Sequence, residues 1–416
     1  MFLSQGNDIN MIKKEIKPKE ELWTSSFISA CIGNFLLFFA FYLLVPILPL
    51  YLIEEFHSSK LMVGVILSSY TLAALLIRPI SGFILDMFYR KPIYLMAYLL
   101  FVISFIGYPL ANLVSTFLFI RILHGFTFGF VTTAGNSFIV DIMPASRRGE
   151  GLGYFGISNT LSMAFGPMTS LYMHDYYNFD IIFYTAIASG LLGLLFAIRI
   201  KSTNTVDRTV KQPMAFDRFF LFKGFKAGLC LLLMGIPYGM LVTYIAIFGK
   251  ELGIQSGVGV FFSLMAFGLI SSRVLAGKLV DKGKLTNVVA TGTLICLLSM
   301  LLLSGLGQLN SEYYTLIVIL FYSISLFLGI GYGLLFPAYN TLFVNLAPNN
   351  RRATASSTYM TSWDFGIGIG LILGGWLADS NGGLPLAYFG GAIATSISYL
   401  YFKSIAGPHF VKYKLR

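Results

Sequence analysis

The feature that most restricts the fold of this chain is a series of long apolar segments that nearly fills it from Ser25 to Phe402. An α-helix needs about 20 mostly apolar residues to cross the hydrocarbon core of a bilayer. Twelve segments reach this length, at residues 25–53, 61–85, 92–111, 115–141, 151–172, 180–200, 226–249, 256–279, 287–307, 314–344, 354–378 and 385–403. We therefore predict an all-α membrane protein with twelve transmembrane helices.

Composition argues against the other classes of fold. Apolar residues make up 56% of the 416 residues and charged residues 11%, whereas a soluble protein of this length needs more charge to cover its surface. An outer-membrane barrel would show segments of about ten residues with alternating polarity. The first apolar segment is too long for a cleavable signal peptide. Cys31, Cys230 and Cys296 all fall within apolar segments, so we interpret them as packing residues and not as disulfide partners.

The basic residues predict the orientation of the helices. Of the 29 Lys and Arg residues, 24 lie at the chain ends and in the connections on the same side, and only Lys60 and Lys250 lie in the opposite connections. The positive-inside rule therefore places both termini in the cytoplasm, in a bacterial-type plasma (inner) membrane. The predicted domains are a cytoplasmic N-terminal segment at 1–24, a six-helix bundle at 25–200, a cytoplasmic basic linker at 201–225, a second six-helix bundle at 226–403 and a cytoplasmic tail at 404–416. The net charge of +11 is then a signal of topology and not of nucleic-acid binding.

The second half of the chain repeats the first. A shift of 195 or 204 residues superposes similar residues, which are Arg78 with Arg273, Asp86 with Asp281, Gly125 with Gly329, Gly129 with Gly333, Asn136 with Asn340 and Arg147 with Arg351. Two pseudosymmetric bundles of the same orientation characterise a transporter architecture in which the substrate binds midway between the halves. We expect the repeated Gly-x-x-x-Gly spacing to serve close helix packing.

Several motifs carry a family resemblance. The segment Gly82–Lys91 resembles the signature loop between helices 2 and 3 of the major facilitator superfamily, and Gly277–Lys284 resembles its second copy. Arg121-Ile-Leu-His-Gly125 resembles the helix-4 arginine motif of that family. Prolines in the first helix and Gly166-Pro167 in the fifth resemble its 12-helix drug:proton antiporter branch. The resemblance implies the major facilitator fold and export of a solute against protons.

The signature loops predict a cytoplasmic gate. Asp86 and Asp281 end two equivalent helices, and each carboxylate could dock on the start of a helix in the other half. A helix N-terminus favours an anion by about 0.3–1 kcal/mol. The other predicted gate residues are Arg78, Arg90, Lys91, Arg147, Arg273 and Arg351. The alternative is that the loop residues only set the topology and that Arg78 and Arg273 extend to the membrane surface.

Ionisable residues inside the helices predict proton coupling. Asp364 lies near the centre of its helix, and Arg121 lies within the fourth helix. Charges within the membrane mark an ion pathway or a partner. We expect Asp364 to take up and release a proton, Arg121 to be its cationic partner and His124, on the same helix face as Arg121, to relay protons. The alternative is a fixed ion pair, with a histidine that is merely hydrogen-bonded.

The predicted substrate site consists of polar and aromatic residues on the four helices that are central by resemblance. These residues are Asn34, Phe38 and Tyr42, which form one stripe of the first helix, with Tyr238, Tyr332, Phe336 and Asn340. Such a lining suits an amphipathic, uncharged or cationic organic molecule. Each residue taken alone is also consistent with ordinary packing.

The sequence shows no Walker loop, metal-ligand cluster or nucleophile elbow, so we expect no cofactor and no ATP-driven pumping. The prediction is a secondary active transporter, not an enzyme, that exports a small amphipathic solute or drug by proton-coupled alternating access. Proton-coupled nutrient uptake is the alternative, because it would share every feature except direction. An acyltransferase-type membrane enzyme would need a His or Cys beside a carboxylate at one membrane face, and of the four histidines only His174-Asp175, in an outer loop where we expect it to be solvated, comes close. We expect a monomer whose partners are a small-molecule substrate, protons and the lipid bilayer.

Overall fold

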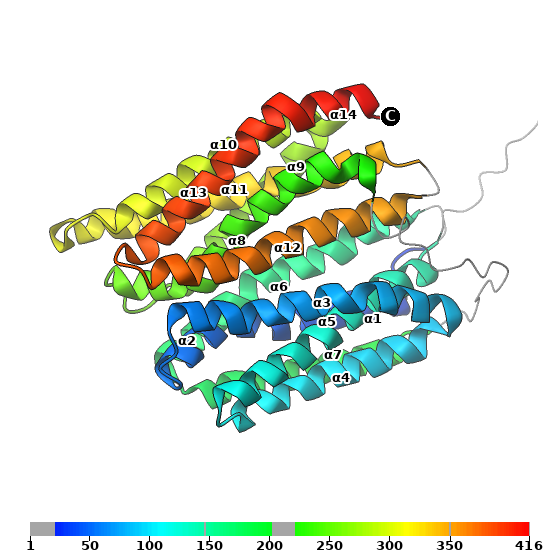
Figure 1. The fold of residues 1–416 in the computed structure, drawn as a ribbon. Coiled ribbons are helices and arrows are strands. Elements are labelled where there is room, and N and C mark those ends of the chain that lie inside the picture. The colour runs from blue at the N-terminus through cyan, green and yellow to red at the C-terminus, as the bar shows by residue number, and fades with distance from the viewer. Residues whose placement is uncertain (1–20, 145–146, 202–220, 349–350, 416) are drawn as a thin grey trace, which may run out of the picture.

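The computed structural model describes residues 21–144, 147–201, 221–348 and 351–415 (Figure 1). Every predicted apolar segment is helical, and the described residues contain no strand, which confirms the predicted all-α fold. The helices are α1 Ser25–Leu44, α2 Ile47–Glu54, α3 Lys60–Met87, α4 Arg90–Leu110, α5 Val114–Ile142, α6 Arg148–Tyr176, α7 Phe179–Arg199, α8 Phe225–Glu251, α9 Gly259–Asp281, α10 Leu285–Leu306, α11 Tyr314–Leu346, α12 Arg352–Ala378, α13 Gly383–Tyr401 and α14 Gly407–Tyr413. Shorter elements are the 3-10 helices Phe222–Gly224 and Ser311–Tyr313 and a π-helix at Phe402–Ala406.

Two predicted segments differ in detail from the structure. The first is divided into α1 and α2 at Val45 and Pro46, because proline has no N–H to donate and its ring clashes with the preceding turn. The tail predicted from residue 404 onward continues instead as helix through Tyr413. The N-terminal segment and most of the predicted linker, at 1–20 and 202–220, lie outside the described residues, and the predicted domain boundaries stay a prediction.

Nine helices in the described part of the chain are long and apolar enough to cross a membrane. These nine, with α1 and α2 counted as one span, do not include α6, α12 and α13, so the count of twelve crossings stays a prediction. Helices α6 and α12 carry polar residues because they meet the opposite half of the protein: α6 packs against α9, and α12 packs against α3. Polar side chains in such helices face the protein interior and not lipid.

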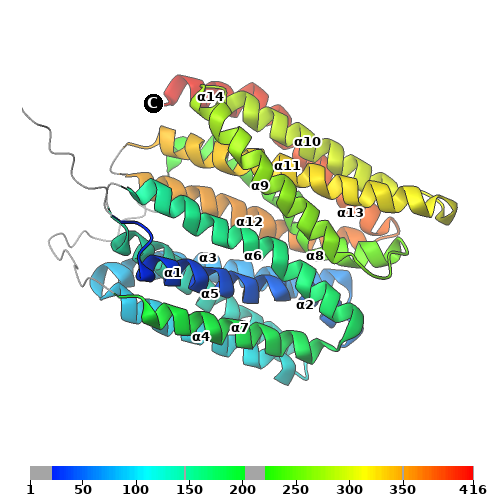
Figure 2. The ribbon, with the colours of Figure 1, turned by 180° about the vertical axis from the view of Figure 1, so that it is seen from behind.

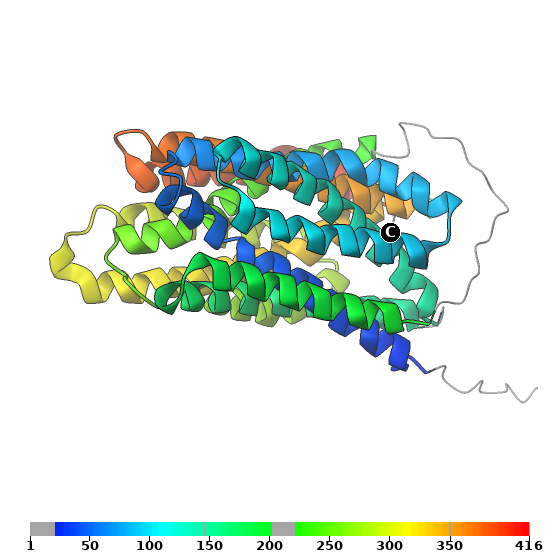
Figure 3. The same cartoon turned by 90° about the horizontal axis from the view of Figure 1, so that it is seen from below.

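The two halves lie side by side, with α1–α7 in one half and α8–α14 in the other (Figures 1 and 2). The described chain begins and ends at the same end of the bundle, which we call the terminal face (Figures 1 and 3). The opposite end, which carries the connections α2–α3, α6–α7, α8–α9 and α12–α13, is called the distal face. Each half is therefore traversed by an even number of long helices in the described residues.

The repeated glycines bring equivalent helices together in each half. A Cβ atom on Gly125 in α5 would collide with the carbonyl oxygen of Tyr70 in α3, and one on Gly329 in α11 would collide with that of Met265 in α9. Both glycines are thus needed for backbone-to-backbone approach, as in other close pairs of membrane helices. The predicted role of the Gly-x-x-x-Gly spacing in close packing is confirmed.

Candidate functional site

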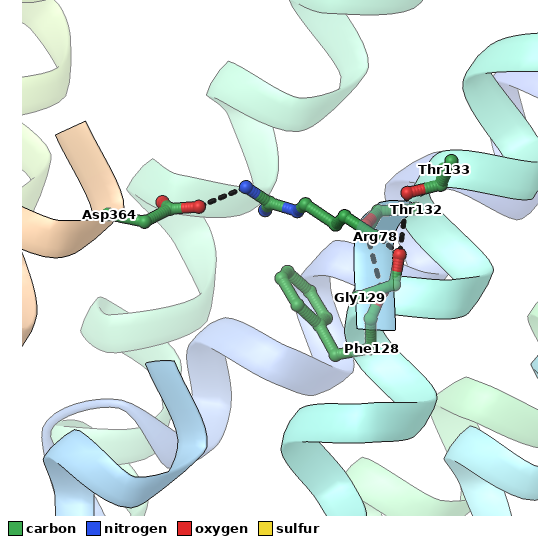
Figure 4. A network of polar contacts seen from close by, with 6 residues as sticks. All are labelled: Arg78, Phe128, Gly129, Thr132, Thr133 and Asp364. Atoms are coloured by element: carbon green, nitrogen blue, oxygen red, sulfur yellow. Dashed lines mark hydrogen bonds and ion pairs between the residues drawn. The ribbon is translucent and has the colours of Figure 1, made fainter. Parts of the chain in front are cut away.

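An ion pair joins the two halves within the helical part of the bundle. The Arg78 guanidinium in α3 donates a hydrogen bond from Nη1 to Oδ2 of Asp364 in α12 (Figure 4). The side chains of Arg78 and Asp364 are 22% and 20% exposed, so both groups lie mostly within the protein. A charge at this depth is tolerated when it is paired, and here each ion supplies the counterion of the other.

The expected pairing of Asp364 with Arg121 is wrong in this structure. Arg121 is only 6% exposed and faces other helices of its own half. Its guanidinium carbon lies 4.2 Å from the centre of the Tyr70 ring, and its Nη1 donates to the Tyr108 hydroxyl at 3.3 Å. The family motif assigns a role to Arg121 but does not determine which way α5 turns this side chain, and α5 turns it toward α3 and α4.

His124 lies beside Arg121, as its spacing predicted. Its Nδ1 is 2.6 Å from the Tyr108 hydroxyl and 3.4 Å from Arg121 Nη1, and the residue is fully buried. Its Nε2 has no hydrogen-bond partner among the residues that the structure describes. Aromatic rings surround the imidazole, with Phe105 the nearest at 4.9 Å between ring centres. The proton-relay role of His124 stays a proposal.

Arg273 in α9, the counterpart of Arg78 in the repeat, makes the equivalent contact from the second half to the first. Its Nη1 donates to Thr160 Oγ1 in α6 at 2.9 Å, so it too joins the two halves. Arg273 lies 195 residues after Arg78, and Asp364 lies 204 residues after Thr160, which are the two shifts of the internal repeat. The Arg78–Asp364 and Arg273–Thr160 contacts are therefore pseudosymmetric copies, one ionic and one neutral.

Aromatic side chains of the predicted substrate site lie together in the second half. The Tyr238 ring is 5.0 Å from Tyr332 and 4.9 Å from Trp363, and Phe336 is 4.9 Å from Trp363, between ring centres. The Tyr238 hydroxyl reaches the first half, where it donates to Met163 Sδ at 3.7 Å. Sequence reasoning assigned no role to Trp363, although its place directly before Asp364 was a signal. We call Tyr238, Tyr332, Phe336 and Trp363 the aromatic cluster.

The other predicted substrate residues are more dispersed. Phe38 and Tyr42 stack on each other at 6.2 Å between ring centres. Asn34 is 7% exposed and donates from Nδ2 to Ser158 Oγ at 2.7 Å, so it ties α1 to α6 within the first half. Asn340 in α11 is exposed. The structure thus brings three of the seven predicted substrate residues into the aromatic cluster.

At the terminal face, the described pairs of predicted gate residues stay within one half. Arg90 Nη1 donates to Asp141 Oδ1 at 2.7 Å, and Arg147 pairs with Glu150 at 2.8 Å. Asp281 is exposed at the end of α9. Lys91 is partly exposed and Arg351 is exposed, whereas the side chain of Asp86 lies outside the described part. Asp281 makes no hydrogen bond or ion pair with the opposite half among the described residues, and the proposed docking of both aspartates stays a proposal.

At the distal face, by contrast, polar contacts join the two halves, and sequence reasoning missed them. Lys250 Nζ pairs with Glu54 at 2.9 Å, and Lys60 Nζ pairs with Glu251 at 2.7 Å. His174 Nε2 also lies 3.2 Å from Glu54. Glu54 is the last residue of α2, and Lys250 lies one residue before the end of α8.

Two aspartates at this face bind the start of a helix in the other half. Asp379, at the end of α12, accepts hydrogen bonds from the backbone N–H groups of Lys60 and Leu61 at 3.0 and 2.8 Å. Asp175, which lies 204 residues earlier at the end of α6, accepts one from Gly257 N at 3.2 Å, just before α9. Asp175 is thus part of an inter-half contact, and His174 borders one through Glu54 of its own half, so the pair is not simply solvated. We call Asp175, Asp379, the Glu54–Lys250 pair and the Lys60–Glu251 pair the distal latch.

Comparison with known proteins identifies the family. The family model of the Major Facilitator Superfamily matches residues 30–371 and 317–409. The chain belongs to the major facilitator superfamily. This transporter is 26% identical over 353 residues to an uncharacterized MFS-type transporter of Methanocaldococcus jannaschii, covering 82% of this chain and 87% of that one. It is 23% identical over 397 residues to multidrug resistance protein 2 of Bacillus subtilis, covering 91% and 94% of the two chains.

Among solved structures, this transporter is similar to a mutant peptide transporter in complex with sulfate. The TM-score is 0.78 at 17% identity, and the likeness covers 95% of this chain and 98% of the other, which shows the shared fold. The predicted family, the major facilitator fold and the absence of an enzymatic role are confirmed. The protein is a multi-pass membrane transporter of small molecules.

Proposed function

We propose that this transporter couples the movement of a small amphipathic organic solute to protons, with Asp364 as the proton carrier and export as the direction. The observation that carries the proposal is the Arg78–Asp364 ion pair, because it lies between the two halves that must move relative to each other. The terminal face, which carries the basic connections, is the cytoplasmic side by the positive-inside rule. Export is supported by the similarity to multidrug resistance proteins.

The ion pair provides a physical link between protonation and the position of the halves. With Asp364 ionised, attraction to Arg78 holds α12 against α3. A proton on Asp364 removes the charge and with it most of this attraction, so the contact between the halves weakens. Conversely, separating the halves leaves Asp364 without a cation and raises its affinity for a proton. Proton binding and the movement of the halves therefore change each other's free energy, as energetic coupling between two events requires.

The remaining candidate residues take supporting roles in this mechanism. The distal latch favours the state that is closed toward the outside, so the solute enters from the cytoplasmic face and contacts the aromatic cluster. Arg121 and His124 form a buried polar group beside this route, with Tyr108 as their shared partner. The predicted gate of Asp86, Asp281 and the nearby arginines would close the terminal face in the other state.

The proposal is tested with purified protein in liposomes under an imposed pH gradient. We expect Asp364→Asn to abolish gradient-driven transport while the solute still equilibrates down its own gradient. The matched control is Asp180→Asn, which removes an exposed acid at the distal face. Gel filtration and circular dichroism establish that both variants fold. Full gradient-driven transport by Asp364→Asn would rule out Asp364 as the proton carrier.

A second candidate function, proton-coupled uptake, is favoured by one observation. The inter-half region holds two arginines, Arg78 and Arg273, but Asp364 is the one carboxylate paired there among the described residues. A surplus positive charge favours a solute with negative charge, whose binding would be strengthened by a proton on Asp364. The same liposome assay distinguishes the directions, since the sign of the pH gradient that drives accumulation differs between them.

A further inference from the structure

The two pseudosymmetric contacts between the halves differ in one respect, which is the charge of the acceptor. Arg78 in the first half meets the carboxylate of Asp364, whereas Arg273 in the second half meets the hydroxyl of Thr160. The repeat superposes these residues, so Thr160 occupies the position at which the other copy carries an acid. Both arginines lie well inside their helices, at equivalent depths.

Arg273 lacks a counterion in the described part of the chain. No carboxylate of the described residues forms an ion pair with it, and its buried Nε atom has no hydrogen-bond partner among them. Its other neighbours are aromatic. The Phe336 ring centre lies 5.9 Å from the guanidinium carbon. The hydroxyls of Tyr42, Tyr238 and Tyr359 are close enough to interact with the charge of Arg273. One threonine hydroxyl satisfies one of the five N–H donors of a guanidinium.

An unpaired cation at this depth is costly, and such a group in a membrane protein marks a ligand site by default. A guanidinium is matched in shape to carboxylate and related anions, which accept two of its N–H bonds at once. Arg273 keeps part of its surface accessible, and so do Phe336 and Trp363 of the aromatic cluster. A solute that reached Arg273 would therefore lie against aromatic rings.

We infer that Arg273, together with Thr160, binds the anionic group of the transported solute. The anion pairs with Arg273 beside Thr160, as the carboxylate of Asp364 pairs with Arg78. The solute class is an amphipathic organic anion, a carboxylate or sulfonate whose apolar body packs on Phe336 and Trp363. This inference rests on the proposed transport function, and it replaces the uncharged or cationic solute that the aromatic lining alone suggests.

The inference is tested by isothermal titration calorimetry of the purified full chain with two probes, p-toluenesulfonate and p-toluenesulfonamide. The two have nearly the same shape, and only the sulfonate is charged. We expect the sulfonate to bind at least about tenfold more tightly, which corresponds to one charge-assisted hydrogen bond. Arg273→Gln should remove that preference and leave sulfonamide binding within about twofold. Lys278→Gln, which removes an exposed cation from the same helix, is the matched control and should change neither affinity.

A second variant tests the role of the acceptor position. Thr160→Asp supplies Arg273 with a carboxylate from within the protein, so the sulfonate preference should disappear while the fold is retained. Three results would overturn the inference: no sulfonate binding, equal binding of the two probes, or equal weakening of both by Arg273→Gln, as expected for an arginine that only braces α9 against α6. Binding requires no gradient, so Asp364→Asn should keep the sulfonate preference. Failure of proton coupling and failure of the anion site are therefore separate results.

Discussion

The distal latch makes a quantitative prediction about the balance between the two states of the transporter. Asp379 and Asp175 each bind backbone N–H groups at the start of a helix in the other half, so these bonds exist only when the distal face is closed. Replacing both aspartates by asparagine keeps the shape of each side chain but removes its negative charge. The closed state is then stabilised less, whereas the state that is open at the distal face is unaffected.

The size of the effect follows from the geometry. Asparagine caps a helix about as well as aspartate, so the double variant loses only the interaction of each charge with the helix N-terminus, about 0.3–1 kcal/mol per site. Both aspartates are exposed, so we take about 0.5 kcal/mol for each, which is a factor of about two in the equilibrium. The two aspartates contact different helices, so their effects should add, to about 1 kcal/mol and roughly a fivefold change. The Glu54–Lys250 and Lys60–Glu251 pairs remain in the double variant.

Double electron–electron resonance between two spin labels, one on each half, measures this shift in population. Nitroxide labels at Asn112→Cys and Gln308→Cys, both exposed at the distal face, report its opening, with Cys31→Ser to remove the one partly exposed cysteine of the described residues. We expect a longer distance to gain population in Asp175→Asn/Asp379→Asn. The control is Asp180→Asn, which removes a charge from the same face. Indistinguishable distance distributions for the double variant and the control would refute the latch.

Two further predictions concern packing and charge. Gly329→Val should lower the temperature of thermal unfolding, because its side chain would strike the Met265 carbonyl and overpacking costs about 1–3 kcal/mol. The control is Gly305→Val, since a Cβ at that position has no neighbour within 4 Å. An equal loss in both variants would contradict the packing argument. The affinity for p-toluenesulfonate, measured by calorimetry, should change severalfold as lower pH protonates Asp364: direct attraction to the more positive charge around Arg273 raises it, whereas the movement of the halves that export requires lowers it. In Asp364→Asn the affinity for p-toluenesulfonate should be independent of pH in that range. A pH dependence equal to that of the unmodified protein would assign the effect to another group.

The fold could be predicted from the sequence because the length of an apolar segment directly reflects the thickness of a bilayer. The predicted segment 61–85 is α3 at Lys60–Met87, and 287–307 is α10 at Leu285–Leu306. The break at Pro46 was missed because a proline within a membrane helix is compatible with a continuous helix, a kink or an interruption. Local sequence does not distinguish these outcomes, since neighbouring helices decide whether the freed backbone groups find partners.

The site was predictable in its residues but not in its contacts. Arg78, Arg273 and Asp364 were recognisable because charges within apolar segments are rare. Their partners depend on which helices of the two halves face each other, and that information is tertiary. The equivalence of Thr160 and Asp364 was present in the repeat, but it gained meaning only when the structure showed both residues opposite equivalent arginines. The distal latch was missed because each of its residues, such as Asp175, lies just outside a predicted apolar segment, where a solvated charge is the ordinary expectation.

The charge between the halves bears on the direction of transport. With Asp364 ionised, it and the two arginines carry a net charge of one positive unit, and the hydroxyls of Tyr42, Tyr70 and Tyr359 near Asp364 add none. A proton on Asp364 adds a second unit, so by charge alone the proton and an anionic solute strengthen each other's binding. Such synergy moves both in the same direction and favours uptake. Export requires the opposite: protonation of Asp364 must favour a state with low affinity for the solute. This effect must act through the α3–α12 contact, and it must outweigh the direct attraction between the added positive charge and the anionic solute. Solute affinity that rises at low pH would therefore support uptake, whereas affinity that falls would show that the movement of the halves dominates and would support export.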